Sequence, residues 1–169
     1  MLKTERLTLR PFRLEDASTA CQLFGTDEDM YRYSGWNPYA TVEEAERFIR
    51  TTMEDDDPHA RCFAIEYAGR IVGNIGAYNY EKDKNRIEVG FSTAKTYWGM
   101  GFATETLKVV LRFLMESENV SAVIAWCAKD NVASKRVLEK AGMVFESVEK
   151  AGLTVRNKTY DKLNYVYPK

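Results

Sequence analysis

The sequence has few of the residues on which metal centres, disulfide scaffolds and nucleophilic hydrolases depend. Its three cysteines, Cys21, Cys62 and Cys127, are widely spaced and form no C-x-x-C pair. Neither a disulfide framework nor a zinc site is therefore indicated, and no metal site is expected. The one histidine, His59, follows the acidic run Asp55–Pro58 in a segment typical of a solvated loop. This scarcity argues against a Ser-His-Asp or Cys-His hydrolase.

Long apolar runs and an excess of one charge are also absent. The first residues, MLKTERLTLRPF, contain no apolar signal segment, and no run approaches the ~20 residues of a membrane helix. A formal net charge of −1 gives no overall attraction to nucleic acid or to an anionic membrane. With 45% hydrophobic residues, the chain can bury a core. We expect one domain over residues 1–169, a cytoplasmic location, and neither nucleic-acid nor membrane partners.

Hydrophobic periodicity and turn residues predict the elements of the first half of the chain. Leu7–Phe12 is predicted as a short strand and Leu14–Phe24 as a helix. Thr41 and Glu44 form a capping box that begins a second helix. Two apolar runs meet at Ala68-Gly69, which predicts a β-hairpin.

The second half alternates strands and helices before a final strand pair. A strand at Arg86–Thr93 leads into an amphipathic helix, and a buried strand follows at Ala122–Cys127. Asp130 or Asn131 caps a helix that ends at Gly142. The last strands are Met143–Lys150 and Thr159–Tyr167.

The element order is therefore β-α-α-β-β-β-α-β-α-β-β. It predicts an α+β (mixed α/β) fold, with a mixed, mostly antiparallel central sheet flanked by helices. The strand–helix–strand unit after the meander should place its two strands parallel to each other.

The stretch YWGMGFATETLKVVL, Tyr97 to Leu111, places two glycines at the start of a helix. A dinucleotide-binding turn is disfavoured, because Thr104 stands where a third glycine is needed and the preceding strand is antiparallel. A Walker A loop would need G-K-[ST], which is missing. Two interpretations remain: a tight turn without function, or a loop whose free amides hold a different phosphate.

Trp98–Ala103 resembles the Q/R-x-x-G-x-G/A pyrophosphate loop of the GNAT superfamily of acetyl-CoA-dependent N-acetyltransferases. The longer match WGMGFATE resembles the branch that includes the bacterial ribosomal-protein N-terminal alanine and serine acetyltransferases. NVASKRVLEKAGMVFE is similar to that branch's N-x-x-S-x-x-x-x-x-K-x-G-F segment, and TERLTLRPFRLEDA is typical of its start. Two positions depart from the pattern: Trp98 replaces Gln or Arg, and Met143 replaces Phe.

The resemblance implies that acetyl-CoA is the cofactor. It also implies a bulge on the strand Arg86–Thr93, for which Gly90 is suitable, and a pantetheine arm that adds to the exposed sheet edge. The residues expected to contact the cofactor are Phe91, Ser92, Thr93, Trp98, Gly99, Met100, Gly101, Phe102, Ala103, Thr104, Asn131 and Ser134.

Catalytic and acceptor residues follow from the same resemblance. Glu88 stands where several relatives carry a general base, although it could instead pair with Arg86 or a lysine. Ser134 stands where the branch places a serine near the thioester sulfur. Trp36 and Tyr39 could line the acceptor mouth, or simply pack.

The predicted function is transfer of an acetyl group from acetyl-CoA to a primary amine by direct attack on the thioester. The amine is a protein or peptide N-terminus or a small molecule. The alternatives are a non-catalytic acyl-CoA-binding sensor or scaffold and, more distantly, a dinucleotide-binding oxidoreductase. Pairing through the last strands would give a homodimer.

Overall fold

A computed structural model describes residues 1–25, 27–35 and 39–168. The strands are β1 (Leu2–Lys3), β2 (Thr8–Pro11), β3 (Arg61–Tyr67), β4 (Arg70–Glu81), β5 (Arg86–Thr93), β6 (Ala122–Ala128), β7 (Val144–Val155) and β8 (Lys158–Pro168). The α-helices are α1 (Ala17–Phe24), α2 (Glu28–Tyr31), α3 (Val42–Met53), α4 (Phe102–Glu116) and α5 (Val132–Ala141), and 3-10 turns include η1 (Leu14–Asp16) and η3 (Lys95–Tyr97).

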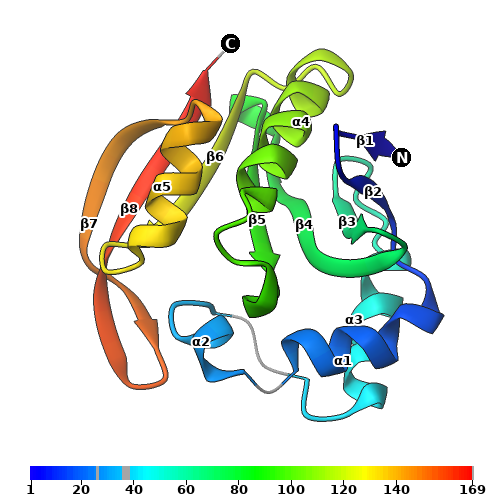
Figure 1. Cartoon of the computed structure of the whole chain (residues 1–169). Helices are drawn as coiled ribbons and strands as arrows, with labels where there is room; N and C mark the ends of the chain where they lie inside the picture. The colour runs from blue at the N-terminus through cyan, green and yellow to red at the C-terminus, as the bar shows by residue number, and fades with distance from the viewer. Residues whose placement is uncertain (26, 36–38, 169) are drawn as a thin grey trace.

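The strands form one sheet in the order β1-β2-β3-β4-β5-β6-β8-β7 (Figure 1). Every neighbouring pair is antiparallel except β5 and β6, which are parallel and joined through α4. The predicted mixed, mostly antiparallel sheet and its parallel crossover unit are therefore confirmed. Within the described residues, no helix combines the length and apolarity needed to cross a membrane.

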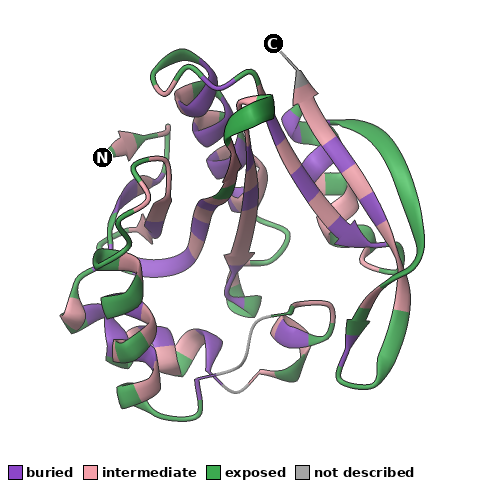
Figure 2. Ribbon diagram, turned by 180° about the vertical axis from the view of Figure 1, so that it is seen from behind, coloured by how far each residue is buried: buried purple, intermediate pink, exposed green. Residues whose placement is uncertain are grey.

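Each face of the sheet packs against a different set of helices. The larger core joins residues such as Ile87 and Val123 of the sheet to Leu107 and Leu111 of α4 and Leu138 of α5. A second core, under α1 and α3, contains sheet residues whose side chains point to the opposite face, such as Ala64 and Ile71. Buried and less buried positions alternate along the central strands, as the period of a β-strand requires (Figure 2).

The turns and caps form where the sequence predicts them. Ala68 and Gly69 connect β3 to β4 with positive φ angles of 49° and 79°, as a tight hairpin turn requires. The Thr41 hydroxyl accepts a hydrogen bond from the Glu44 amide at 3.3 Å, and the Glu44 carboxylate accepts one from the Ala40 amide at 2.7 Å. Asn131, rather than Asp130, caps α5.

The final hairpin is longer than the sequence pattern predicts. β7 continues to Val155, because Ala151, at a φ of 52°, lies in a bulge between Glu149 and Leu153 after which pairing with β8 resumes. Such a bulge interrupts the alternation of polar and apolar residues by which a strand is identified.

The first helix is shorter than the predicted Leu14–Phe24. Leu14–Asp16 forms a 3-10 turn, and the α-helix starts only at Ala17.

β7 is one of the two edge strands of the sheet, and most of its length is exposed (Figure 2). Three of its apolar side chains are accessible to solvent: Val144, Phe145 and Val148. An exposed apolar edge strand offers unpaired backbone groups to another chain. A homodimer formed through the last strands stays a prediction.

Candidate active site

β5 and β6 separate halfway along their length. They pair only at Arg86–Glu88 with Ala122–Ile124, and Glu88 opposite Ile124 is the last pair. Beyond it β5 remains paired with β4 as far as Thr93, while β6 remains paired with β8 as far as Ala128. The sheet therefore opens into a gap that widens toward the starts of the loops leading to α4 and α5.

The gap does not arise from a bulge at Gly90, contrary to the sequence prediction. Gly90 pairs in regular register with Gly76 of β4, and the irregularity lies on β4 itself, between Tyr78 and Glu81. A Cβ atom built on Gly90 would collide with the Tyr78 hydroxyl. The glycine therefore makes room for the Tyr78 ring, and a glycine within a strand often marks such a close approach.

Beyond Glu88, backbone groups of β5 face the gap and have no partner on β6. Ala94 donates its N–H to Val72 of β4 at 2.8 Å, and backbone groups alternate in direction along a strand. The groups of Ser92 therefore face β4, whereas those of Phe91 and Thr93 face the gap. The indole N–H of Trp98 donates a hydrogen bond to the Thr93 carbonyl at 2.6 Å. Trp98 thus ties the following loop to the end of β5.

Gly99 and Gly101 give the loop a shape that other residues rarely adopt. Both have a φ of +81°, and no atom lies within 4 Å of the position that a Cβ on Gly99 would take. Gly101 is the N-cap of α4, so the amides of Phe102, Ala103 and Thr104 begin the helix without a preceding turn to accept their hydrogen bonds. Small residues, free amides and a helix N-terminus fit a phosphate group.

Glu88 lies at the apex of the gap with its carboxylate held by neutral donors. Trp126 of β6 donates its indole N–H to Oε1 at 2.7 Å, and Asn79 donates its amide to Oε2 at 3.3 Å. Glu88 is not paired with Arg86, which instead binds Glu81 at 2.7 Å. Tyr78 is the register partner of Glu88, and burial, followed by the Glu88 charge, raises the pKa of its phenol.

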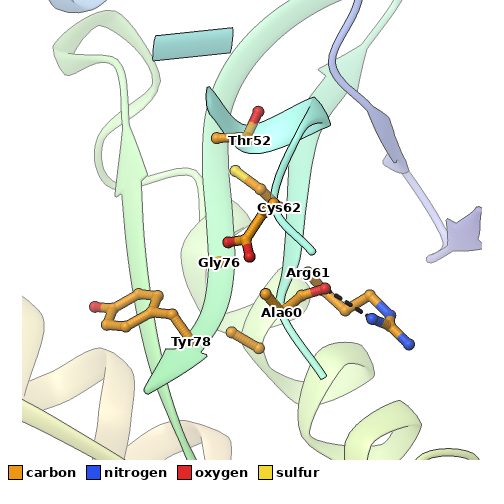
Figure 3. A pocket seen from close by; sticks show the side chains of 8 residues that line it. Thr52, Ala60, Arg61, Cys62, Gly76 and Tyr78 are labelled. Atoms are coloured by element: carbon orange, nitrogen blue, oxygen red, sulfur yellow. Dashed lines mark hydrogen bonds between the residues drawn. The ribbon is translucent and has the colours of Figure 1, made fainter. Parts of the chain in front are cut away.

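Two hollows adjoin Tyr78 and Glu88 on the face opposite α4 and α5. One, of about 370 Å³, is bounded by Glu88 and Trp126 and by polar side chains of β7 and β8 such as Lys162 and Asn164. The other, of about 220 Å³, lies between the end of α3 and the strands β3 and β4, with Cys62 and Tyr78 in its wall (Figure 3). Burial raises the pKa of the Cys62 thiol to about 12, so this thiol is protonated at neutral pH.

Asn131 and Ser134 lie on the other side of the gap, where β6 leads into α5. The Asn131 side chain accepts a hydrogen bond from the Ser134 amide at 3.1 Å, so it caps α5. Ser134 lies in the first turn of α5 and is partly exposed. The structure thus places the predicted residues of the two helix starts at the same open end of the sheet.

Of the two predicted acceptor residues, the one that the structure describes, Tyr39, does not line this gap. Tyr39 is buried in the core under α1 and α3, where its ring lies 5.4 Å from that of Phe48. Trp36 lies outside the described residues. Tyr33 packs edge-on against Tyr160 of β8, with 5.3 Å between the ring centres, which joins the segment after α2 to the final hairpin.

Comparison with known proteins identifies the family. The family model described as an acetyltransferase (GNAT) domain matches residues 6–144. The chain belongs to the GNAT acetyltransferase family. It is 26% identical over 155 residues to the N-acetyltransferase p20 of Bacillus licheniformis, covering 90% of this chain and 84% of p20.

Solved GNAT structures share the fold. A GNAT-family acetyltransferase from Bacillus anthracis superimposes with a TM-score of 0.88 at 25% identity, covering 99% of this chain and 97% of that one. RimL, a ribosomal L7/L12 α-N-protein acetyltransferase in complex with coenzyme A, superimposes with a TM-score of 0.89 at 17% identity, covering 98% and 95% of the two chains. The family model and the curated relatives, which include a putative ribosomal N-acetyltransferase of Bacillus subtilis that is 25% identical over 167 residues, confirm the resemblance to GNAT N-acetyltransferases. The chain is an N-acetyltransferase.

Several residues at the candidate site were not predicted from the sequence. Trp126 binds Glu88 from a strand that is 38 positions away, and Tyr78 faces Glu88 across the β4–β5 pair. Arg6, from the connection between β1 and β2, binds Glu105 at the start of α4. Arg6 lies in the motif TERLTLRPF, whose letters alone do not indicate a contact with α4.

Proposed function

We propose that this protein transfers the acetyl group of acetyl-CoA to a primary amine, with the amine attacking the thioester directly. The observation that carries the proposal is the gap that opens between β5 and β6 after Glu88, with a glycine loop and the start of α4 at its open end. RimL, which shares this fold, is described in complex with coenzyme A.

The residues around the gap fit the parts of acetyl-CoA. The amides of Gly99, Gly101 and the first turn of α4 would hold the pyrophosphate. The backbone groups of Phe91 and the N–H of Thr93, whose carbonyl accepts the Trp98 indole, would bind the pantetheine arm as an added strand. When bound, acetyl-CoA supplies an acyl group activated as a thioester.

Protein groups on each side of the gap would move the protons. Glu88 would accept a proton from the incoming ammonium, directly or through water, and the Trp126 and Asn79 donors hold its carboxylate in place. Ser134, at the start of α5, would donate a hydrogen bond to the departing sulfur. The 370 Å³ hollow bounded by Glu88 gives an amine a route to that carboxylate.

Thiol release from acetyl-CoA, followed together with mass analysis of the amine, tests the proposal. The panel contains peptides that begin with Ser or Ala, polyamines, aminoglycosides and free amino acids. We expect at least one amine to gain one acetyl group for each thiol released. Release without an acetylated product, or no binding of acetyl-CoA, would reject the proposed transfer.

A non-catalytic acyl-CoA sensor is the alternative, because the glycine loop alone is sufficient for binding. A sensor does not need the Glu88 carboxylate. It would bind acetyl-CoA with the same affinity in the native protein and in Glu88→Gln, and neither would acetylate any amine of the panel.

Gly99→Ala is expected to weaken acetyl-CoA binding about 10-fold or more, because a methyl group would enter the open space where a phosphate oxygen needs to approach the backbone. Calorimetric titration measures this affinity.

Gly69→Ala is a matched control for backbone strain. Gly69 has a φ of +79° and likewise no atom within 4 Å of its built Cβ, but it lies in the β3–β4 turn. Both variants should lose about 1 kcal/mol of stability, since left-handed backbone disfavours alanine. If both bind acetyl-CoA equally well, the loop at Gly99 does not contact the cofactor.

A further inference from the structure

Arg6 contacts the glycine loop and the start of α4 simultaneously. Its Nε and Nη2 atoms donate to Oε2 of Glu105 at 2.8 and 2.6 Å, and Nη2 also donates to the Met100 carbonyl at 3.0 Å. The guanidinium lies 4.8 Å from the centre of the Phe102 ring. One side chain from the N-terminal segment therefore holds three successive parts of the loop and helix.

The bond to the Met100 carbonyl sets the direction of the next amide. The chain has no cis peptide among its described residues, and in a trans peptide the C=O and N–H groups point in opposite directions. Because Arg6 fixes the Met100 oxygen on its own side, the N–H of Gly101 points away from Arg6. Within the described part of the chain, that N–H has no protein acceptor. It is thus oriented for an external anion.

Arg6 also compensates the charge of Glu105. A carboxylate in the first turn of a helix is favoured by the helix dipole, but it would repel a bound pyrophosphate. Burial raises the pKa of Glu105, but the hydrogen bonds from Thr4 and Arg6 outweigh this effect and lower it overall. Glu105 is therefore ionised at neutral pH, and Arg6 provides the matching positive charge.

We propose that Arg6 is a positioning residue for the pyrophosphate of the cofactor: it orients the Gly101 amide and neutralises Glu105. This inference rests on the proposed function, because it requires that the loop binds acetyl-CoA. Lysine cannot replace Arg6 fully, since a point charge cannot bond the Met100 oxygen and the Glu105 carboxylate with the same fork geometry.

Binding of two probes to Arg6→Met tests the inference. Calorimetry should show CoA binding weakened about 10- to 100-fold, the usual range for losing charge-assisted hydrogen bonds. Pantetheine, which lacks the pyrophosphate, should bind the native protein and the variant equally by NMR titration. The CoA affinity of Arg6→Lys should lie between those of the native protein and Arg6→Met. Equal losses for both probes, or an unchanged CoA affinity, would overturn the inference.

Glu105 provides a second, independent variant. In Glu105→Gln the Met100 contact of Arg6 can persist and the repulsive charge is gone, so CoA should bind no more weakly than to the native protein. Arg6→Met combined with Glu105→Gln should recover part of the affinity lost in Arg6→Met. If Glu105→Gln weakens CoA binding as much as Arg6→Met, the pair only supports folding.

Two comparisons separate the possible failures. Arg13→Met removes an exposed arginine whose guanidinium pairs with exposed Glu15, so it controls for the lost positive charge. If the native protein does not bind CoA, the proposed function fails. If the native protein and Arg6→Met bind CoA equally, only the role of Arg6 fails. Should Arg6→Met not fold, Arg6→Lys and Glu105→Gln decide the question.

Discussion

Glu88→Gln is expected to lower kcat about 100-fold or more while leaving the affinity for acetyl-CoA unchanged. A positioned general base typically contributes a factor of this size. Glutamine keeps an oxygen that can accept the Trp126 indole N–H, now 2.7 Å from Oε1, so the side chain should remain in place. Steady-state kinetics with the amine identified by the panel measure kcat, and calorimetry measures the affinity.

The basicity of the acceptor distinguishes a base from a structural carboxylate. An α-amino group, with a pKa near ~8, is partly neutral at pH 7 to 8, whereas a lysine-type amine, near ~10.4, must lose its proton in the site. The loss in Glu88→Gln should therefore be larger for the more basic amine. Equal losses for both amines would contradict a role as base. Glu146→Gln, an exposed carboxylate at the same hollow, is the control, and we expect its kcat to stay within about twofold.

Asp16→Asn is expected to lower the thermal midpoint by about 10 °C. Arg10 donates to both Asp16 oxygens at 2.8 Å, and both side chains are largely buried. Removing one partner of a buried ion pair costs about 3 to 5 kcal/mol, and the lower end applies here because Arg10 keeps its bond to Glu66 at 2.8 Å. Each kcal/mol shifts the midpoint of a domain of this size by roughly 2 to 4 °C. Thermal unfolding measures the shift. Glu15→Gln in the same turn should shift it by less than about 4 °C, because the Arg13–Glu15 pair is exposed.

The effect of Asp16 should depend on pH. Burial raises the pKa of this carboxyl, but the hydrogen bonds from Arg10 and the Arg13 amide lower it below its ordinary value of 3.8. A carboxyl with a lowered folded pKa stabilises the protein at pH values above 3.8 and loses that contribution as the pH falls through the folded value. The difference between native protein and Asp16→Asn should therefore shrink as the solution is acidified. A constant difference would contradict this account.

The parts of the site that depend on local backbone geometry could be predicted from the sequence. Gly99 and Gly101 adopt the positive φ that glycine permits, and Asn131 caps the helix that follows it. The parallel β5–α4–β6 unit followed from element order and connection rules. These features depend on neighbouring residues or on short segments, so the sequence pattern contains them.

The contacts between distant segments could not be predicted in the same way. Arg6 and Glu105 are 99 positions apart, and their meeting depends on how β1 and β2 lie against α4. The wrong prediction of a bulge at Gly90 has a similar cause. A glycine in a strand fits either a bulge or a close approach, and only the register that brings Tyr78 over Gly90 distinguishes them.

Amide NMR spectra of the isotope-labelled protein during a CoA titration show directly where the cofactor binds. We expect the largest shifts at the amides of Phe91 and Thr93, along the β5 side of the gap, and of the loop from Gly99 to Thr104, at its open end. We expect little change at the amides of Ala68 and Gly69 in the β3–β4 turn. Saturating CoA that leaves the loop amides unmoved, or that shifts only residues remote from the β5–β6 gap, would contradict binding at this site.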